Sequence, residues 1–436
     1  MAAQAAAILQ GNDTGSLIKA APGLYPHQWS WDAAFIAIGL AHVSLDRAVA
    51  ELRALFRGQW RNGMVPHIVY APDAPADAYF PDAARWDVQR VAAEAPAGVA
   101  TSGIIQPPVH AIAVAHLCER AGNDRMRAIA AEFYAPLREW HRYLLSARDP
   151  EVSGLITIVH PWESGMDNSP RWDQALARVD VPLDELPPFQ RRDLAHVADP
   201  AERPTDEDYN RYLWLVEVLK RGGYRVDRIY DTLPFRVKDV FFSALLVSAN
   251  EALLRIATWA DADLDDLSLI EAWIERGRRG LAERWDDARG LCLDFDVAGD
   301  TSIAARTIAT FAPLIAGQVT QELRHQLLEL WRSEAFTGHP RLRWPLPPST
   351  SPLEPTFMPR RYWRGPVWPV MNWLCWWAWQ RLGEEEIAAT LRAHALAQVE
   401  SSGFVEYVEP FTGEGLGSDM QSWTAAVVLD WLAAES

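Results

Sequence analysis

The chain has 436 residues, of which 49% are hydrophobic and 23% charged, a composition typical of a globular protein. Its formal net charge of -17 at pH 7 argues against nucleic acid or an anionic membrane as a partner, because both would repel this surface. The three cysteines, Cys118, Cys292 and Cys375, are odd in number and far apart, which indicates neither a disulfide framework nor a zinc motif.

The chain begins with an Ala-rich segment, residues 2–9, which predicts a first helix. No basic stretch precedes it, and no window of about 18 uninterrupted apolar residues follows, so the sequence indicates neither a signal peptide nor a membrane span. We therefore expect a cytoplasmic protein.

Two kinds of helical segment alternate along the chain. Segments that are apolar on most faces should be buried, and they span residues 31–44, 106–121, 235–256, 303–316, 367–382 and 421–434. Amphipathic segments with one charged face should lie outside them, and they span residues 46–58, 124–147, 264–286, 319–333 and 384–402. With residues 2–9 these make six outer and six inner helices, which predicts an (α/α)6 toroid. A two-domain helical protein is the alternative.

The connections between these helices are unequal in length. Links from an inner to an outer helix are short, whereas links from an outer to an inner helix are long, so all long loops should lie at one end of a single catalytic domain spanning residues 1–436. The longest loop spans residues 148–234 and contains an extra helix at 206–221. We interpret this insertion as a small cap over a pocket. Residues 291–296 are expected to form a strand.

One long loop, residues 160–173, combines carboxylates with tryptophans and cannot form a regular helix or strand. It contains Trp162, Glu163, Gly165, Asp167 and Asp173 in a chain that has 21 Trp in all. An indole offers an apolar face to a pyranose ring, and a carboxyl beside it is partly desolvated, which raises its pKa toward the range of a general acid. This pattern is typical of glycoside chemistry.

Hydrolysis of a glycosidic bond needs a proton donor and a second carboxylate that activates water or attacks the sugar. The second long loop with suitable acids spans residues 403–415 and contains Glu406, Glu409 and Glu414. Single carboxylates in loops are usually turn formers or helix caps. Two aromatic, acid-bearing loops at the same end of one barrel favour an active site.

Three further motifs lie at the expected pocket end. Tyr25 to Asp32 enters the first inner helix, and Arg361 to Pro369 enters the fifth; each brings two Trp to a helix start, where they could equally fill the centre of the toroid. Arg203 and Tyr209 flank the start of the inserted helix, where a guanidinium and a phenol could bind an anionic leaving group.

Asp263-Leu264-Asp265-Asp266 matches the D-x-D-D acid motif of one class of terpene cyclases, which are also aromatic-lined α/α barrels. It falls in a short link at the opposite end from the long loops, where Asp265 most simply caps the next helix. The eleven histidines show no metal-ligand spacing, so the sequence predicts no metal site and no cofactor.

Taken together, these motifs resemble those of the bacterial mannosylglycerate and glucosylglycerate hydrolases, which are related to glycoside hydrolase family 63. The resemblance covers nearly the whole chain, and its most specific element is Trp162-Glu163-Ser164-Gly165-Met166-Asp167-Asn168-Ser169-Pro170. It implies an inverting mechanism with Asp167 as general acid and Glu406 as general base. It also implies that Arg203 and Tyr209 hold the glycerate carboxylate and that the sugar is bound by Tyr25, Trp29, Trp31, Asp32, Tyr79, Gln106, Trp162, Gly165, Trp363 and Trp368.

The resulting hypothesis is an inverting hydrolase of a small α-glucoside or α-mannoside, with 2-O-α-glucosylglycerate and 2-O-α-mannosylglycerate as preferred substrates. The alternatives are an oligosaccharide α-glucosidase or trehalase-like enzyme with a neutral substrate, a terpene-cyclase-like barrel, and an inactive carbohydrate-binding protein. The choice between glucose and mannose, the aglycone, any homo-oligomer and any movement of the cap are left open. Where Met420-Gln421 precede Ser422-Trp423, the family pattern leads us to expect an aromatic residue.

Overall fold

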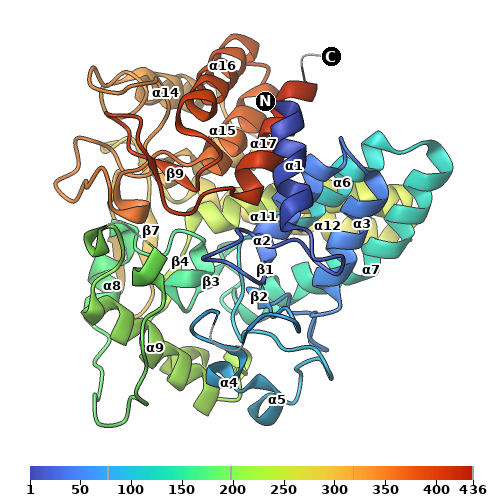
Figure 1. Ribbon diagram of the computed structural model, residues 1–436, viewed down its shortest axis with the longest axis vertical. Coiled ribbons are helices and arrows are strands. Elements are labelled where there is room, and N and C mark those ends of the chain that lie inside the picture. Colours follow the sequence, from blue (N-terminus) through green and yellow to red (C-terminus); the bar gives the residue numbers. More distant parts are fainter. Residues whose placement is uncertain (76–77, 197–198, 318, 435–436) are drawn as a thin grey trace.

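The structure, a computed structural model, describes residues 1–75, 78–196, 199–317 and 319–434. Residues 197–198 of the predicted insertion and the last two residues of the predicted domain therefore lie outside the described residues. Figure 1 shows a helix-rich molecule in which the first and last helices lie side by side.

Six largely buried helices contact one another in a closed circuit: α2 contacts α6, then α11, α13, α15 and α17 follow, and α17 returns to α2. Their bounds are α2 Ser30–Leu40, α6 His110–Arg120, α11 Val240–Trp259, α13 Ala312–Ala316, α15 Pro369–Arg381 and α17 Ser422–Ala433. These are the six segments predicted as inner helices. By length and composition α11 alone among the described helices could cross a membrane, but 83% of its most apolar stretch is buried inside the molecule.

A second set of helices packs against this circuit. Helix α1 contacts α17, α3 contacts α2, α7 contacts α6 and α11, α12 contacts α11, and α16 contacts α15. Helix α14 reaches α15 through Trp331, whose ring lies 5.7 Å from that of Trp379. Their bounds are α1 Ala2–Asn12, α3 Leu45–Phe56, α7 Asn123–Ala147, α12 Leu264–Ala282, α14 Gln321–Arg332 and α16 Glu385–Ser402.

The helix ends follow local chemistry. Pro107 and Pro108 delay α6 until His110, whereas Pro369 fits the first turn of α15 because its missing N–H has no partner there anyway. The prediction of a helix over residues 303–316 was wrong in extent. Residues 301–303 form a strand, a 3-10 turn follows at Ile308–Phe311, and α13 has only five residues. Gly317, with a φ of +85°, ends this helix.

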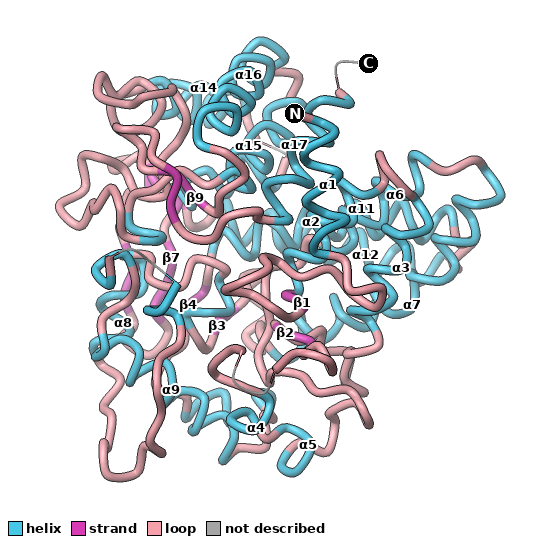
Figure 2. Tube along the Cα trace, in the orientation of Figure 1, coloured by secondary structure: helices cyan, strands magenta, loops and turns pink. Residues whose placement is uncertain are grey.

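The long connections gather on one side of the helices, with short strands among them (Figure 2). Antiparallel pairs join connections that are distant in sequence: β1 pairs with β2, and β3, β4, β7 and β8 form a four-stranded sheet. The strands are β1 Gln28–Trp29, β2 Ile68–Val69, β3 Thr157–Ile158, β4 Val237–Lys238, β5 Trp285–Asp286, β6 Leu291–Cys292, β7 Asp294–Asp296, β8 Thr301–Ile303, β9 Tyr407–Val408 and β10 Gly415–Leu416. Strands β6 and β7 confirm the strand expected at 291–296.

Short helices complete the connections: α4 Ala83–Trp86, α5 Val88–Val91, α8 Asp173–Ala177, α9 Asp206–Arg221 and α10 Val226–Ile229. Helix α9 is the predicted extra helix. It begins with a capping box in which the Thr205 side chain and the Asp208 side chain each hydrogen-bond the other's backbone N–H. The rings of Tyr209 and Tyr212 place this helix against Trp162.

The D-x-D-D motif forms the start of α12. Asp263, rather than the expected Asp265, is the N-cap, and its carboxyl accepts a hydrogen bond from Asp266 N at 2.8 Å. The Asp266 carboxyl in turn accepts hydrogen bonds from Tyr134 and Arg138 of α7. The motif therefore stabilises a helix start and a helix contact.

Candidate active site

A cavity lies among the long connections, five of which supply residues to its wall. Of the fourteen predicted site residues, eleven line it: Tyr25, Trp29, Trp31, Asp32, Tyr79, Gln106, Trp162, Gly165, Asp167, Trp363 and Glu406. Four more line it without having been predicted: His67, Tyr362, Gln421 and Trp423. The cavity thus brings Asp167 and Glu406 together from loops 239 residues apart in sequence.

The other three predicted residues lie behind this wall. Trp368 lies flat on Trp363, with ring centroids 3.6 Å apart and planes 2° apart, so it supports the indole that faces the cavity. The Tyr209 hydroxyl donates to the Phe80 carbonyl at 3.3 Å. Arg203 does not line the cavity itself. It donates a hydrogen bond at 3.2 Å to the hydroxyl of Tyr25, which does.

Gly165 is required by both its conformation and its surroundings. Its φ of +69° is a left-handed backbone conformation that residues with a side chain rarely adopt. A Cβ built there would also lie 2.7 Å from the Trp31 ring. The backbone of the 160–173 loop can therefore approach the Trp31 indole only with glycine at this position.

Of the three acids in the 160–173 loop, only Asp167 faces the cavity. Glu163 is fully buried in an ion pair with Arg148, and the Asp173 carboxylate pairs with Arg364. The Asp167 carboxyl accepts no hydrogen bond from any other described residue. It is thus free to address a ligand.

In the second loop, Glu406 is held from three sides. Its Oε1 accepts from the Tyr25 hydroxyl at 2.9 Å, its Oε2 accepts from Ser418 N at 3.0 Å, and the Arg203 guanidinium lies 3.7 Å from Oε2. Glu409 instead accepts from the backbone N–H groups of Phe411 and Thr412, which shapes the turn. Glu414 pairs with Arg360 at the surface.

Burial raises the pKa of all three carboxyls in this cavity. Burial, opposed by Arg203 and reinforced by Glu406, raises the pKa of Asp167 to about 7. Burial and the charges of Glu406 and Asp167 raise the pKa of Asp32 to about 8. Burial also raises the pKa of Glu406, while Arg203, the Tyr25 hydroxyl and Ser418 N–H favour its charged form. Near neutral pH, Asp32 and Asp167 can therefore hold protons.

Tyr362 is the most informative residue that the sequence did not single out. Its hydroxyl lies 3.4 Å from that of Tyr25, and the Arg203 guanidinium lies 4.6 Å from its ring centroid. Its φ of +39° is unusual for a bulky residue. The aromatic run at 361–369 was a usable signal, but only its tryptophans were assigned.

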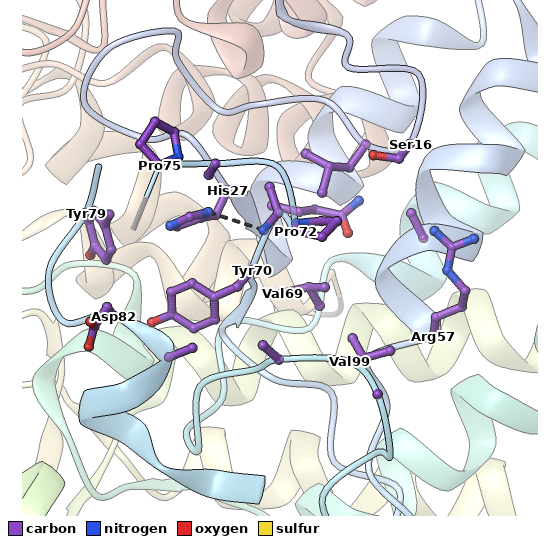
Figure 3. A pocket seen from close by; sticks show the side chains of 18 of the residues that line it. Ser16, His27, Arg57, Val69, Tyr70, Pro72, Pro75, Tyr79, Asp82 and Val99 are labelled. Atoms are coloured by element: carbon purple, nitrogen blue, oxygen red, sulfur yellow. Dashed lines mark hydrogen bonds between the residues drawn. The ribbon is translucent and has the colours of Figure 1, made fainter. Parts of the chain in front are cut away.

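A second and larger pocket, of about 520 Å³, adjoins this cavity and shares the Tyr79 side chain with it (Figure 3). Its wall contains His27, Tyr70, Val99 and Arg57, and among the described residues that line it Asp82 is the one carboxylate. The described part of this wall therefore lacks the pair of carboxyls that glycoside hydrolysis requires. Among the described residues, no group of three or more His, Cys, Asp or Glu side chains is placed to hold a metal ion.

Comparison with known proteins identifies the family of this chain. Residues 25–424 match the family model of the mannosylglycerate hydrolase MGH1-like glycoside hydrolase domain. The chain belongs to this family of glycoside hydrolases. This glycoside hydrolase is 49% identical to the glucosylglycerate hydrolase of Mycolicibacterium hassiacum, over 99% of this chain and 97% of that relative. It is 44% identical to the mannosylglycerate hydrolase of Thermus thermophilus, over 98% and 99% of the two chains.

A solved structure supports the same family assignment. A glycoside hydrolase family 63 mannosylglycerate hydrolase of Thermus thermophilus, crystallised with Tris and D-glycerate, superposes on this glycoside hydrolase with a TM-score of 0.91. The two share 43% sequence identity, and the match covers 99% of each chain. The family expected from the sequence motifs is thereby confirmed.

Proposed function

We propose that this glycoside hydrolase cleaves 2-O-α-glucosylglycerate or 2-O-α-mannosylglycerate with inversion at the anomeric carbon. The observation that carries the proposal is the placement of Asp167 and Glu406 in one indole-walled cavity, with Arg203 in contact with Glu406. The relatives named above, which are hydrolases of these two substrates, support the choice of aglycone.

In the proposed reaction, the Asp167 carboxyl gives its proton to the glycosidic oxygen as the bond between that oxygen and the anomeric carbon breaks. A water molecule attacks the anomeric carbon from the opposite face, and Glu406 takes up one of its protons. The pKa of about 7 keeps Asp167 largely protonated at slightly acidic pH. The contacts of Glu406 with Tyr25, Ser418 and Arg203 favour its carboxylate form.

The sugar would bind among the indoles. Faces and edges of Trp29, Trp31, Trp162 and Trp363 form much of the cavity wall and suit the C–H surfaces of a pyranose. Asp32 and Gln106 add polar groups between them. A protonated Asp32 carboxyl both donates and accepts hydrogen bonds, as paired sugar hydroxyls require.

Arg203 is the group best suited to the glycerate carboxylate. The side chain is 4% exposed, and its Nε and Nη2 donate no hydrogen bond to any described residue. Buried guanidinium donors without a hydrogen-bond acceptor fit an incoming carboxylate, which can accept two hydrogen bonds from one Arg. The Thermus thermophilus relative was crystallised with D-glycerate, which supports glycerate as the aglycone. The hydrogen bond from Tyr209 to Phe80 leaves that phenol a weaker candidate.

We further propose that the closed circuit of inner helices, with the outer helices packed against it, is an (α/α)6 toroid. Residues 1–436 would then form one catalytic domain, with the 148–234 insertion and α9 as its cap. A cytoplasmic location likewise remains a prediction from the sequence.

The decisive experiment incubates the protein with 2-O-α-glucosylglycerate, 2-O-α-mannosylglycerate and neutral α-glucosides, and follows the released sugar by proton NMR. We expect rapid hydrolysis of at least one glycerate substrate, with the β-anomer appearing before mutarotation. First release of the α-anomer would exclude inversion. Cleavage of the neutral glucosides alone would exclude the glycerate substrates.

A further inference from the structure

The Asp167 carboxyl is the proposed proton donor, but no neighbouring side chain holds it in place. A general acid must lie within hydrogen-bond reach of the oxygen it protonates. Yet no other described residue donates to the Asp167 carboxyl, in contrast to Glu406, which has three partners. The direction of the Asp167 carboxyl must therefore be set by the backbone on either side of it.

Four residues before Asp167, the Glu163 carboxylate ties three segments together. It is fully buried and accepts two hydrogen bonds from Arg148, at 2.8 and 2.7 Å, just beyond the end of α7. It also accepts from Val159 N at 2.7 Å and Ile105 N at 3.3 Å. Ile105 precedes Gln106, a residue of the cavity wall, so one carboxylate fixes both the acid-bearing loop and the opposite connection.

Four residues after Asp167, Arg171 forms a second buried ion cluster. Its guanidinium is 1% exposed and binds the Asp294 carboxylate through Nε at 2.7 Å and Nη2 at 2.6 Å. It also pairs with Asp239, the N-cap of α11. The loop is thereby attached to β7 and to the start of an inner helix.

Between these two clusters further hydrogen bonds restrain the backbone, among them Met166 N to Ser164 Oγ at 2.9 Å, Ser169 N to the Met166 carbonyl at 3.0 Å and Arg364 Nη1 to the Asn168 carbonyl at 3.2 Å. Trp172 Nε1 donates to the Met166 carbonyl at 2.8 Å, and the Tyr212 hydroxyl donates to the Asp167 carbonyl at 3.2 Å. The Asn168 side chain accepts from Trp363 N at 3.0 Å. These contacts hold the peptide groups around Asp167, and the ion clusters hold the two ends of the segment.

We propose that Glu163 and Arg171 are positioning residues that aim the Asp167 carboxyl at the glycosidic oxygen. Buried ion pairs suit this role because their fixed geometry persists where no water competes for the charges. The proposal rests on the proposed function of Asp167 as the proton donor. It predicts a larger defect where the leaving group needs a proton than where it needs none.

The test compares two substrates with the same sugar and different leaving groups. The glycerate oxygen needs a proton as its bond breaks, whereas fluoride leaves an α-glycosyl fluoride as the free ion and needs none. We expect Glu163→Gln to lower kcat/KM for the glycerate substrate about 100-fold, as for a misplaced catalytic group, and to lower fluoride hydrolysis less than about 5-fold. The change should lie in kcat rather than KM.

Three further variants complete the experiment. Arg171→Lys, which keeps the charge but loses the two-nitrogen grip on Asp294, should show the same selectivity for the glycerate substrate even if Glu163→Gln folds poorly. Asp430→Asn removes a buried carboxylate of α17 that binds His42 and Trp373, outside the cavity wall, and should lower the melting temperature without changing the ratio of the two rates. Asp167→Asn should lose glycerate hydrolysis and retain fluoride hydrolysis.

The outcomes separate the two proposals. Equal loss on both substrates in folded Glu163→Gln or Arg171→Lys, or no loss on either, would overturn the positioning role while leaving the function intact. Equal loss on both substrates in Asp167→Asn would instead overturn the assignment of Asp167 as the proton donor.

Discussion

The Arg203 guanidinium lies 3.7 Å from the Glu406 carboxylate, Nη2 to Oε2, and both side chains are almost completely buried. The residue proposed to bind the substrate carboxylate therefore also acts on the proposed base. Its positive charge favours the charged form of Glu406 and so lowers the pKa of that carboxyl.

Replacing Arg203 by Ala should consequently affect two properties. Without the guanidinium the pKa of Glu406 rises, so the acidic limb of the pH–rate profile should move to higher pH even for a neutral α-glucoside. The glycerate substrates should lose an additional tenfold or more in kcat/KM, on the order of one lost charge-assisted hydrogen bond. Steady-state kinetics between pH 4 and pH 9, on both substrate types, would check this. An unmoved acidic limb would contradict the coupling to Glu406.

The basic limb of the same profile should report Asp167. Because the proton donor must be protonated, activity on the glycerate substrate should fall as pH rises through about 7, the pKa of this carboxyl. An α-glycosyl fluoride needs no proton for its leaving group, so its hydrolysis should keep its rate in that range. If both substrates lost activity together, another group would be responsible for the basic limb.

Glu406→Gln should reduce turnover by two or more orders of magnitude while leaving the circular dichroism spectrum unchanged, since a neutral amide cannot accept the proton of water. Glu409→Gln and Glu414→Gln are the matched controls from the same loop. The first carboxylate shapes a turn and the second pairs with Arg360 at the surface, so both variants should retain turnover within about tenfold. Near-normal turnover of Glu406→Gln would transfer the role of base to one of them.

Asp32 should lower the stability of the folded protein in alkaline solution. Its pKa rises from 3.8 to about 8 on folding, so above pH 4 the unfolded chain ionises this carboxyl while the folded chain still holds its proton. Stability therefore decreases as pH rises from about 4 to about 8. Asp32→Asn removes this effect and should raise the melting temperature by roughly a few degrees at pH 8 and little at pH 4, at the cost of activity. Calorimetry at the two pH values would show an equal shift if this account were wrong.

Gly165→Ala should disturb the sugar pocket through Trp31. The added Cβ meets the indole at 2.7 Å, and the residue keeps a φ of +69°, so both a collision and backbone strain are introduced. We expect a rise in KM of about tenfold or more together with a lower melting temperature. Gly290→Ala is the control, because its φ is +62° and no atom lies within 4 Å of the new methyl group. It should show the strain, about 1 kcal/mol, with unchanged kinetics; similar kinetics for the two variants would argue against the Trp31 contact.

Hydrophobic patterning was sufficient to locate the helices of the inner circuit. Segments such as α11 are apolar on nearly all faces because both sides are packed, and the sequence shows this directly. It was insufficient at residues 303–316, where an equally apolar run divides into a strand, a turn and a five-residue helix. The pairing of β8 with β7 is a local hairpin joined by residues 297–300, and it takes Ile303 out of the expected helix.

Site residues were predicted where the residue type itself indicates the chemistry. They were missed where only the position in the fold gives a residue its role. Asp167 and Glu406 stand out as acids in aromatic loops. Tyr362 is one aromatic residue in a run of them, and the left-handed backbone that turns it toward Tyr25 cannot be read from the sequence. Trp368 illustrates the converse, because a conspicuous tryptophan lies behind the cavity wall, stacked on the indole that faces it.

The contact between α17 and α2 has a consequence for biosynthesis. Helix α17 closes the circuit, and Gln421 and Trp423 at its start complete the cavity wall. A nascent chain that has not yet been extended through α17 therefore has neither a closed core nor a whole sugar site. We expect premature termination upstream of this helix to yield a product without activity, because its cavity wall would lack Gln421 and Trp423.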